Sequence, residues 1–288
     1  MSPEQTPPNS DPQTPESPSA ELPPSDLPPP ELPQATEPPP PPPELPQAAE
    51  PPPQPERYPF WDYFDVILFL GMALPSLLVA GLLVKAAVWV TRISAVPRVA
   101  ELLAAQFVVY ALLFGFLLAV FRIRYDKPLW RSLAWTPLRV PFLWIVIAGF
   151  VTAFLVVIAS SLIQTPDTPN PMTELMEGRT SLILMAIFGV TLGPLFEELG
   201  FRGFLQPLLV RTFGAVAGIL LTAIPFGLLH WQEYGNSWRH VVVITVAGAA
   251  FGWMRHATGS TRAAVIMHAS YNGLFFLGLL RKELPHGW

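Results

Sequence analysis

The stretch FEELGFRGF, residues 196–204, places three charged side chains in an otherwise apolar part of the chain. An ionisable residue at the centre of a bilayer costs about 2.5–3.5 kcal/mol on insertion scales, so such a residue suggests a function. Glu198 and Arg202 are four residues apart and can pair on one side of a helix. Glu197 points about 100° away from Glu198, so the same arginine neutralises it less easily. We therefore expect Glu198 and Arg202 to shape a site in which Glu197 is the reactive carboxylate and general base.

Two histidines extend this set of polar side chains. In PFGLLHW, Phe226 and His230 are four residues apart and share a helix face, as do His268 and Asn272 in AVIMHASYNG. Either histidine alone is typical of a hydrogen-bonded packing residue. Together with two glutamates and an arginine, they could supply a base, stabilise a developing oxyanion or bind a metal. The residue types therefore indicate hydrolytic chemistry.

Other hydrolytic mechanisms are disfavoured by what the sequence lacks. The absence of cysteine excludes thiolate catalysis, disulfides and Cys-ligated metal. There is no HExxH motif of the zincin type, and no GxGD-like aspartate pair occurs in the apolar runs. A serine mechanism would depend on GNSW, residues 235–238, which is a polar loop and leaves the glutamates unexplained.

The polar residues lie on elements that read as membrane helices. A span needs about 20 apolar residues, and an uninterrupted run such as FLWIVIAGFVTAFLVVIA, residues 142–159, lacks the polar face of a soluble helix. We expect an all-α, polytopic membrane helix bundle of about seven spans, with an eighth left open. The expected spans are 64–90, 99–121, 140–163, 180–200 (continuing toward 210), 213–231, 240–256 and 261–280.

The first part of the chain has a different composition. Residues 1–60 hold 24 of the 36 prolines and 10 of the 21 acidic residues, with Arg57 as the only basic one. Such a segment buries too little apolar surface to fold, so we expect a disordered Pro-rich acidic tail over residues 1–57. The turn-rich linker TPDTPNP then divides accessory transmembrane helices, 58–164, from a catalytic membrane core, 165–288.

The distribution of charge indicates orientation and partners. Lys and Arg gather in residues 122–139, and the positive-inside rule places this loop and the N-terminus in the cytoplasm. No basic run with interleaved aromatics occurs, so no nucleic-acid partner is expected. We expect an integral, multi-pass protein of a bacterial inner or plasma membrane, whose partners are the lipid bilayer and a peptide or protein substrate. The oligomeric state is left open.

In its polar motifs the chain resembles the CPBP family of intramembrane proteases. This family includes the CAAX prenyl endopeptidases and bacterial Abi-type bacteriocin-processing or immunity proteins. Its motif EExxxR corresponds to Glu197 through Arg202, FxxxH to Phe226 through His230, and HxxxN to His268 through Asn272. The phrase TGSTRAAVIMHASYNG, residues 258–273, extends the likeness around the third motif. The resemblance covers about residues 180–280.

The resemblance implies roles for these residues. Glu197, assisted by His230, would activate water for attack on a peptide bond, while His268 and Asn272 would stabilise the oxyanion. Glu198, Arg202 and Phe226 would support the site. A divalent metal such as Zn²⁺, held by Glu197, His230 and His268, is permitted by these residue types but not required.

Two other functions stay open beside the leading prediction of a CAAX-protease-like intramembrane endopeptidase. A non-catalytic immunity or scaffold protein of the same family could use the cavity to bind a peptide. A transporter could use buried Glu, His and Arg as a proton relay, although no inverted repeat of hydropathy is evident.

Overall fold

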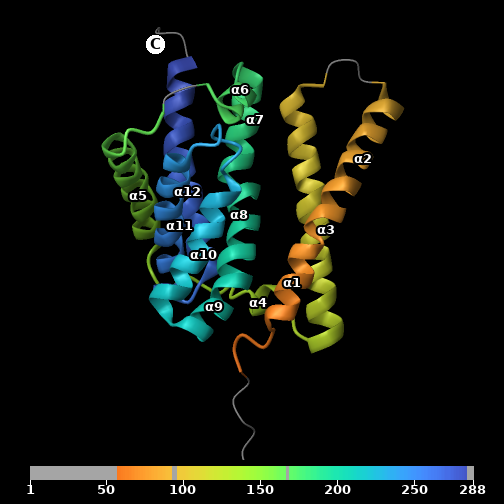
Figure 1. Cartoon of the computed structure of the whole chain (residues 1–288), viewed down its shortest axis with the longest axis vertical. Helices are drawn as coiled ribbons and strands as arrows, with labels where there is room; N and C mark the ends of the chain where they lie inside the picture. Colours follow the sequence, from red (N-terminus) through yellow and green to blue (C-terminus); the bar gives the residue numbers. More distant parts are fainter. Residues whose placement is uncertain (1–56, 93–95, 167–168, 284–288) are drawn as a thin grey trace, which may run out of the picture. The chain divides into compact units, whose positions relative to one another are not determined.

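The computed structural model describes residues 57–92, 96–166 and 169–283 of the chain. In these ranges all regular elements are helices, which confirms the expected all-α class (Figure 1). The predicted tail, residues 1–57, lies outside the described residues except for Arg57. The elements in chain order are α1 (Tyr63–Gly71), α2 (Ala73–Thr91), α3 (Arg98–Tyr125), α4 (Leu129–Ser132), α5 (Phe142–Leu162), α6 (Pro171–Leu175), α7 (Arg179–Val190), α8 (Leu192–Glu198), the π-helix η1 (Leu199–Leu205), α9 (Gln206–Phe213), α10 (Ala215–Leu229), α11 (Trp238–Thr258) and α12 (Thr261–Glu283).

Six helical segments in the described part of the chain are long and apolar enough to cross a membrane. Large apolar side chains also point outward, among them Leu82 and Trp89 of α2. Lipid tails solvate such surfaces, whereas water does not. The chain is therefore an integral membrane protein. The six segments are Tyr63–Thr91, Arg98–Tyr125, Phe142–Leu162, Arg179–Phe213, Trp238–Thr258 and Thr261–Lys282.

The fifth expected span, 213–231, is shorter than predicted. Its helix, α10, has 15 residues, whereas a span needs about 20. The polar sequence QEYGN, residues 232–236, forms a turn instead of another helical turn, with Gly235 and Asn236 at positive φ. The N–H of Met172 donates to the carbonyl of Glu233 at 3.1 Å, so this turn lies against α6. Helix α10 and the turn together lead from the α9 end of the bundle to the α6 end (Figure 1).

Two hydrophobic clusters flank the polar motifs. The first joins α1, α3 and α4 to η1 and α9, and it includes Trp61, Phe121 and Phe204. The second joins α5 to α11 and α12, and it includes Ile145 and Phe251. Leu199 and Phe204 of η1 belong to the first cluster, and Phe251 of the second stacks on His268 of α12.

The described residues between 57 and 283 form one compact unit. Helix α5, which belongs to the predicted accessory part, packs in the second cluster beside α11 and α12. The predicted boundary near residue 164 thus remains a prediction about function, because packing runs across it.

Candidate active site

A fully buried ion pair forms the centre of the site. Glu198, at the end of α8, accepts a hydrogen bond at Oε1 from Nη1 of Arg202, 2.9 Å away. The same oxygen lies 2.9 Å from Nδ1 of His268 on α12, which is also buried. A carboxylate paired with arginine accepts hydrogen bonds only, so Nδ1 of His268 is the donor. The predicted pairing of Glu198 with Arg202 is confirmed.

Arg202 is also held by α11. Its Nη2 donates to the carbonyl of Gly248 at 2.7 Å, and one turn later Gln206 donates to the carbonyl of Gly252 at 2.9 Å. A Cβ at Gly248 would lie 2.9 Å from the Phe226 ring and 3.1 Å from Arg202 Nη2. The two glycines therefore allow α11 to approach closely enough for its backbone to bind these side chains.

The helix that carries the charges widens directly after Glu198. In η1 the N–H of Gln206 donates to the carbonyl of Phe201, five residues earlier. Pro207 gives a physical reason, since its ring would clash with the carbonyl of Gly203 in a regular α-helix and it has no N–H to donate. Short π-helical segments are rare and are frequent at functional sites. The expected ion pair thus spans the start of a π-helix and not a regular α-helix.

Glu197 faces the other nitrogen of His268. Its Oε2 lies 4.0 Å from His268 Nε2, and 27% of its side chain is exposed. This separation is too long for a direct hydrogen bond, but one water about 2.8 Å from each atom could contact both. Because Nδ1 is the donor to Glu198, the neutral ring presents a lone pair at Nε2 toward Glu197. The two adjacent glutamates thus occupy different environments, as the sequence predicts.

Phe226 connects the ion pair to His230. Its ring centroid lies 4.3 Å from the guanidinium carbon of Arg202, and its carbonyl lies 2.9 Å from Nδ1 of His230. A carbonyl can only accept, so Nδ1 of His230 is the donor and the neutral ring presents Nε2 as an acceptor. This arrangement gives both residues of the FxxxH motif a structural role.

Asn272 lies one turn beyond His268 on α12. Its Nδ2 donates to the carbonyl of Gly189 at 2.7 Å, next to the break between α7 and α8. Each amide nitrogen carries two hydrogens, so one is left for another acceptor. The predicted oxyanion role of Asn272 remains a prediction, whereas its link from α12 to α7 is observed.

Glu233, in the turn after α10, is a carboxylate that the sequence analysis did not select. Desolvation raises the pKa of Glu233, while His230 opposes the shift and Glu197 adds to it. Burial and the negative charges of Glu233 and Glu197 raise the pKa of the phenol of the neighbouring Tyr234 to about 12. The spacing of Glu233 three residues after His230 is the sequence signal that could have found it.

The two histidines of the site are oriented as metal ligands often are, but among the described residues the site lacks a third ligand at a suitable distance. Both histidines use Nδ1 toward an oxygen and leave Nε2 available, an arrangement typical of metal ligands. Nevertheless, no group of three or more His, Asp or Glu side chains within residues 57–92, 96–166 and 169–283 is spaced to hold an ion. The arrangement therefore does not fit a three-ligand set of Glu197, His230 and His268.

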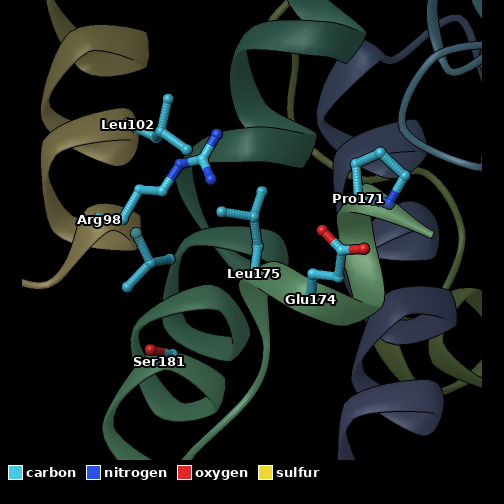
Figure 2. Close-up of a pocket in the computed structure, with 7 residues that line it drawn as sticks. Arg98, Leu102, Pro171, Glu174, Leu175 and Ser181 are labelled. Carbon is cyan, nitrogen blue, oxygen red and sulfur yellow. The ribbon is translucent and has the colours of Figure 1, made fainter. Parts of the chain in front are cut away.

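A pocket at the start of α3 is separate from the residues of the three motifs (Figure 2). It lies between the starts of α3 and α7 and helix α6, with Arg98 on one side and Glu174 on the other. None of the seven residues of the three motifs lines it.

The part of the chain that carries the three motifs is similar to a known protein family. Residues 179–274 match the family described as type II CAAX prenyl endopeptidase Rce1-like. We call this matched segment the Rce1-like domain. The match confirms the resemblance seen in the motifs and contains all three of them. It leaves α1 to α6 outside the Rce1-like domain. No match was found among curated proteins, nor among solved structures.

Proposed function

We propose that the protein is an intramembrane endopeptidase that hydrolyses a peptide bond with water activated by Glu197. The observation that carries the proposal is the position of His268 between two carboxylates, with Nδ1 on Glu198 and Nε2 facing Glu197. A water between Glu197 and His268 would meet a partly exposed carboxylate and an imidazole acceptor. The Rce1-like match supports a protease of this class.

The chemical steps follow from these groups. Glu197 takes a proton as the water oxygen attacks the carbonyl carbon of the scissile bond, and the carbonyl oxygen becomes an oxyanion. Nε2 of His268 accepts from the other hydrogen of this water, Glu198 fixes the ring through Nδ1, and the second N–H of Asn272 Nδ2 donates to the oxyanion. Glu197 then returns the proton to the leaving nitrogen as the C–N bond breaks. Arg202 stays paired with Glu198 throughout.

Glu197→Gln tests this proposal, because it keeps the shape of the side chain but removes the base. Purified wild-type and variant proteins are incubated in detergent with fluorescently labelled β-casein, and membrane peptides from cells making either protein are compared. We expect turnover to fall by a factor of about 10²–10⁴, the range for loss of a general base. The thermal midpoint should stay near that of the wild type. Full turnover in the variant would exclude Glu197 as the base.

Two further measurements separate metal-free hydrolysis from a non-catalytic scaffold function and from a zinc-dependent mechanism. If the variant still binds its peptide or protects cells as the wild type does, the scaffold function is favoured. Metal content is measured in parallel. About one equivalent of zinc, lost together with activity in His230→Ala/His268→Ala, would replace the metal-free mechanism.

A further inference from the structure

Trp61 lies outside the Rce1-like domain in sequence but contacts it in space. Its side chain is fully buried two residues before α1, and its indole N–H donates to the carbonyl of Phe204 at 3.0 Å. Its ring packs against Phe121 of α3 and against Phe204 itself, with centroids 5.2 and 5.6 Å apart. A buried indole N–H requires an acceptor, and here that acceptor is the backbone of η1. A residue near the start of the bundle thus fixes a point on the helix that carries Arg202.

The residues beside Trp61 attach to the same end of the Rce1-like domain. We name residues 58–63 the entry segment. The hydroxyl of Tyr58 accepts from Nη2 of Arg255 at 3.1 Å, and the carbonyl of Pro59 accepts from Arg211. The hydroxyl of Tyr63 donates to Thr212 at 2.7 Å. The entry segment is therefore bound to η1, α9 and α11 at four points.

A short chain of contacts leads from Trp61 to the reacting groups. Phe204 lies two residues after Arg202 within η1. Arg202 binds Glu198, and the same Glu198 oxygen holds Nδ1 of His268. Because a π-helix is intrinsically less favourable than an α-helix, its geometry depends on contacts made from outside it. A change at Phe204 would therefore move Arg202 and alter the orientation of His268.

We propose that Trp61 is a positioning residue for the hydrolytic site. Its hydrogen bond to Phe204 holds η1 in the geometry that orients Arg202, Glu198 and His268. The effect on turnover rests on the proposed function, whereas the effect on η1 does not. The site is thus completed by a residue of the entry segment, which the family match does not include.

Trp61→Phe tests the proposal because it keeps an aromatic ring but removes the N–H donor. The matched control is Trp89→Phe, at an exposed position on α2. Amide hydrogen exchange is measured over residues 199–206 and over α5 in the full-length proteins, and kcat and KM are measured with labelled β-casein. In Trp61→Phe we expect exchange over 199–206 to rise about tenfold with α5 unchanged, as for local opening. We also expect kcat to fall about tenfold at constant KM, since small misplacements of catalytic groups act on turnover.

Each arm can overturn the proposal. Exchange over 199–206 that equals the wild type, or that rises equally in α5, shows that Trp61 contributes only to general packing. A fall in kcat that also occurs in Trp89→Phe likewise overturns it. If the wild type cleaves nothing, the proposed function fails, while the exchange measurement still decides whether Trp61 holds η1.

Discussion

At the scale of single residues, His268 is the side chain of the site whose orientation is held by contacts on two sides. Glu198 fixes one ring nitrogen at 2.9 Å, and Phe251 stacks on the ring with centroids 4.5 Å apart. The ring therefore has little freedom to rotate, and Nε2 stays directed at Glu197. A fixed imidazole needs no reorganisation when charge develops on a bound peptide, which is the usual source of electrostatic stabilisation. This fixed geometry distinguishes His268 from His230, whose Nδ1 is held within its own chain segment by the carbonyl of Phe226.

Glu233 is expected to make the stability of the folded protein depend on pH. Desolvation raises the pKa of Glu233, His230 opposes the shift and Glu197 adds to it, so the folded state disfavours the ionised carboxylate. This raised pKa stabilises the folded protein at low pH, and the contribution is lost as pH rises through the raised value. Glu233→Gln removes the ionisation, so we expect the wild-type thermal midpoint to fall relative to that of the variant over this rise in pH. Glu177→Gln, at an exposed position after α6, serves as the control and should follow the wild type. A difference between Glu233→Gln and the wild type that does not change with pH would contradict this prediction.

The sequence predicts the parts of the site that depend on helical spacing. Glu198 and Arg202 meet because residues four apart share a helix face, and the different environments of Glu197 and Glu198 follow from their 100° separation. The partner of Glu198 on α12 and the Gly248 carbonyl beneath Arg202 were not predictable, since they depend on how helices distant in sequence pack. Glu233 was missed because it lies in a turn, where its three-residue spacing from His230 is a weaker signal than the same spacing within a helix.

At the scale of elements, the approach of α11 to η1 depends on residues without side chains. Gly248 and Gly252 are one turn apart on α11, and their carbonyls accept from Arg202 and Gln206. Both glycines are visible in the sequence, but the helix that α11 approaches through them is not. The π-helix was also not predicted, although Pro207 in the sequence contained the signal for an irregular helix.

Gly248→Ala tests this close approach. The added methyl group would lie 2.9 Å from the Phe226 ring, which is itself packed on Arg202. Overpacking typically destabilises by about 1–3 kcal/mol, so we expect a lower thermal midpoint and, since Arg202 must shift, at least about tenfold lower turnover. The control is Gly115→Ala in α3, where a Cβ would meet nothing within 4 Å. In that variant the gain in helix propensity should leave the midpoint unchanged or slightly higher. Equal behaviour of the two variants would contradict the packing argument.

At the scale of the whole molecule, different segments of the chain meet at the two ends of the bundle. The entry segment, the end of α3 and the end of α9 lie at one end, where Tyr58 meets Arg255 and Pro59 meets Arg211. At the other end Arg239, at the start of α11, donates to the carbonyl of Gln164 after α5. Helix α10 and the following turn lead from one end to the other, although α10 itself is too short for a regular span.

The absence of cysteine makes the orientation of the bundle directly measurable. We propose that the end carrying Arg122, Arg124 and Lys127 faces the cytoplasm, because positive residues are retained on that side. A cysteine replacing exposed Asp126, after α3, should then be protected in intact cells from a maleimide that cannot cross membranes, and should react after permeabilisation. A cysteine replacing exposed Glu177, between α6 and α7, should react in both cases, since it lies at the opposite end (Figure 1). The reverse pattern would invert the orientation, and equal labelling of both positions in intact cells would contradict a bundle whose two ends lie on opposite sides of the membrane.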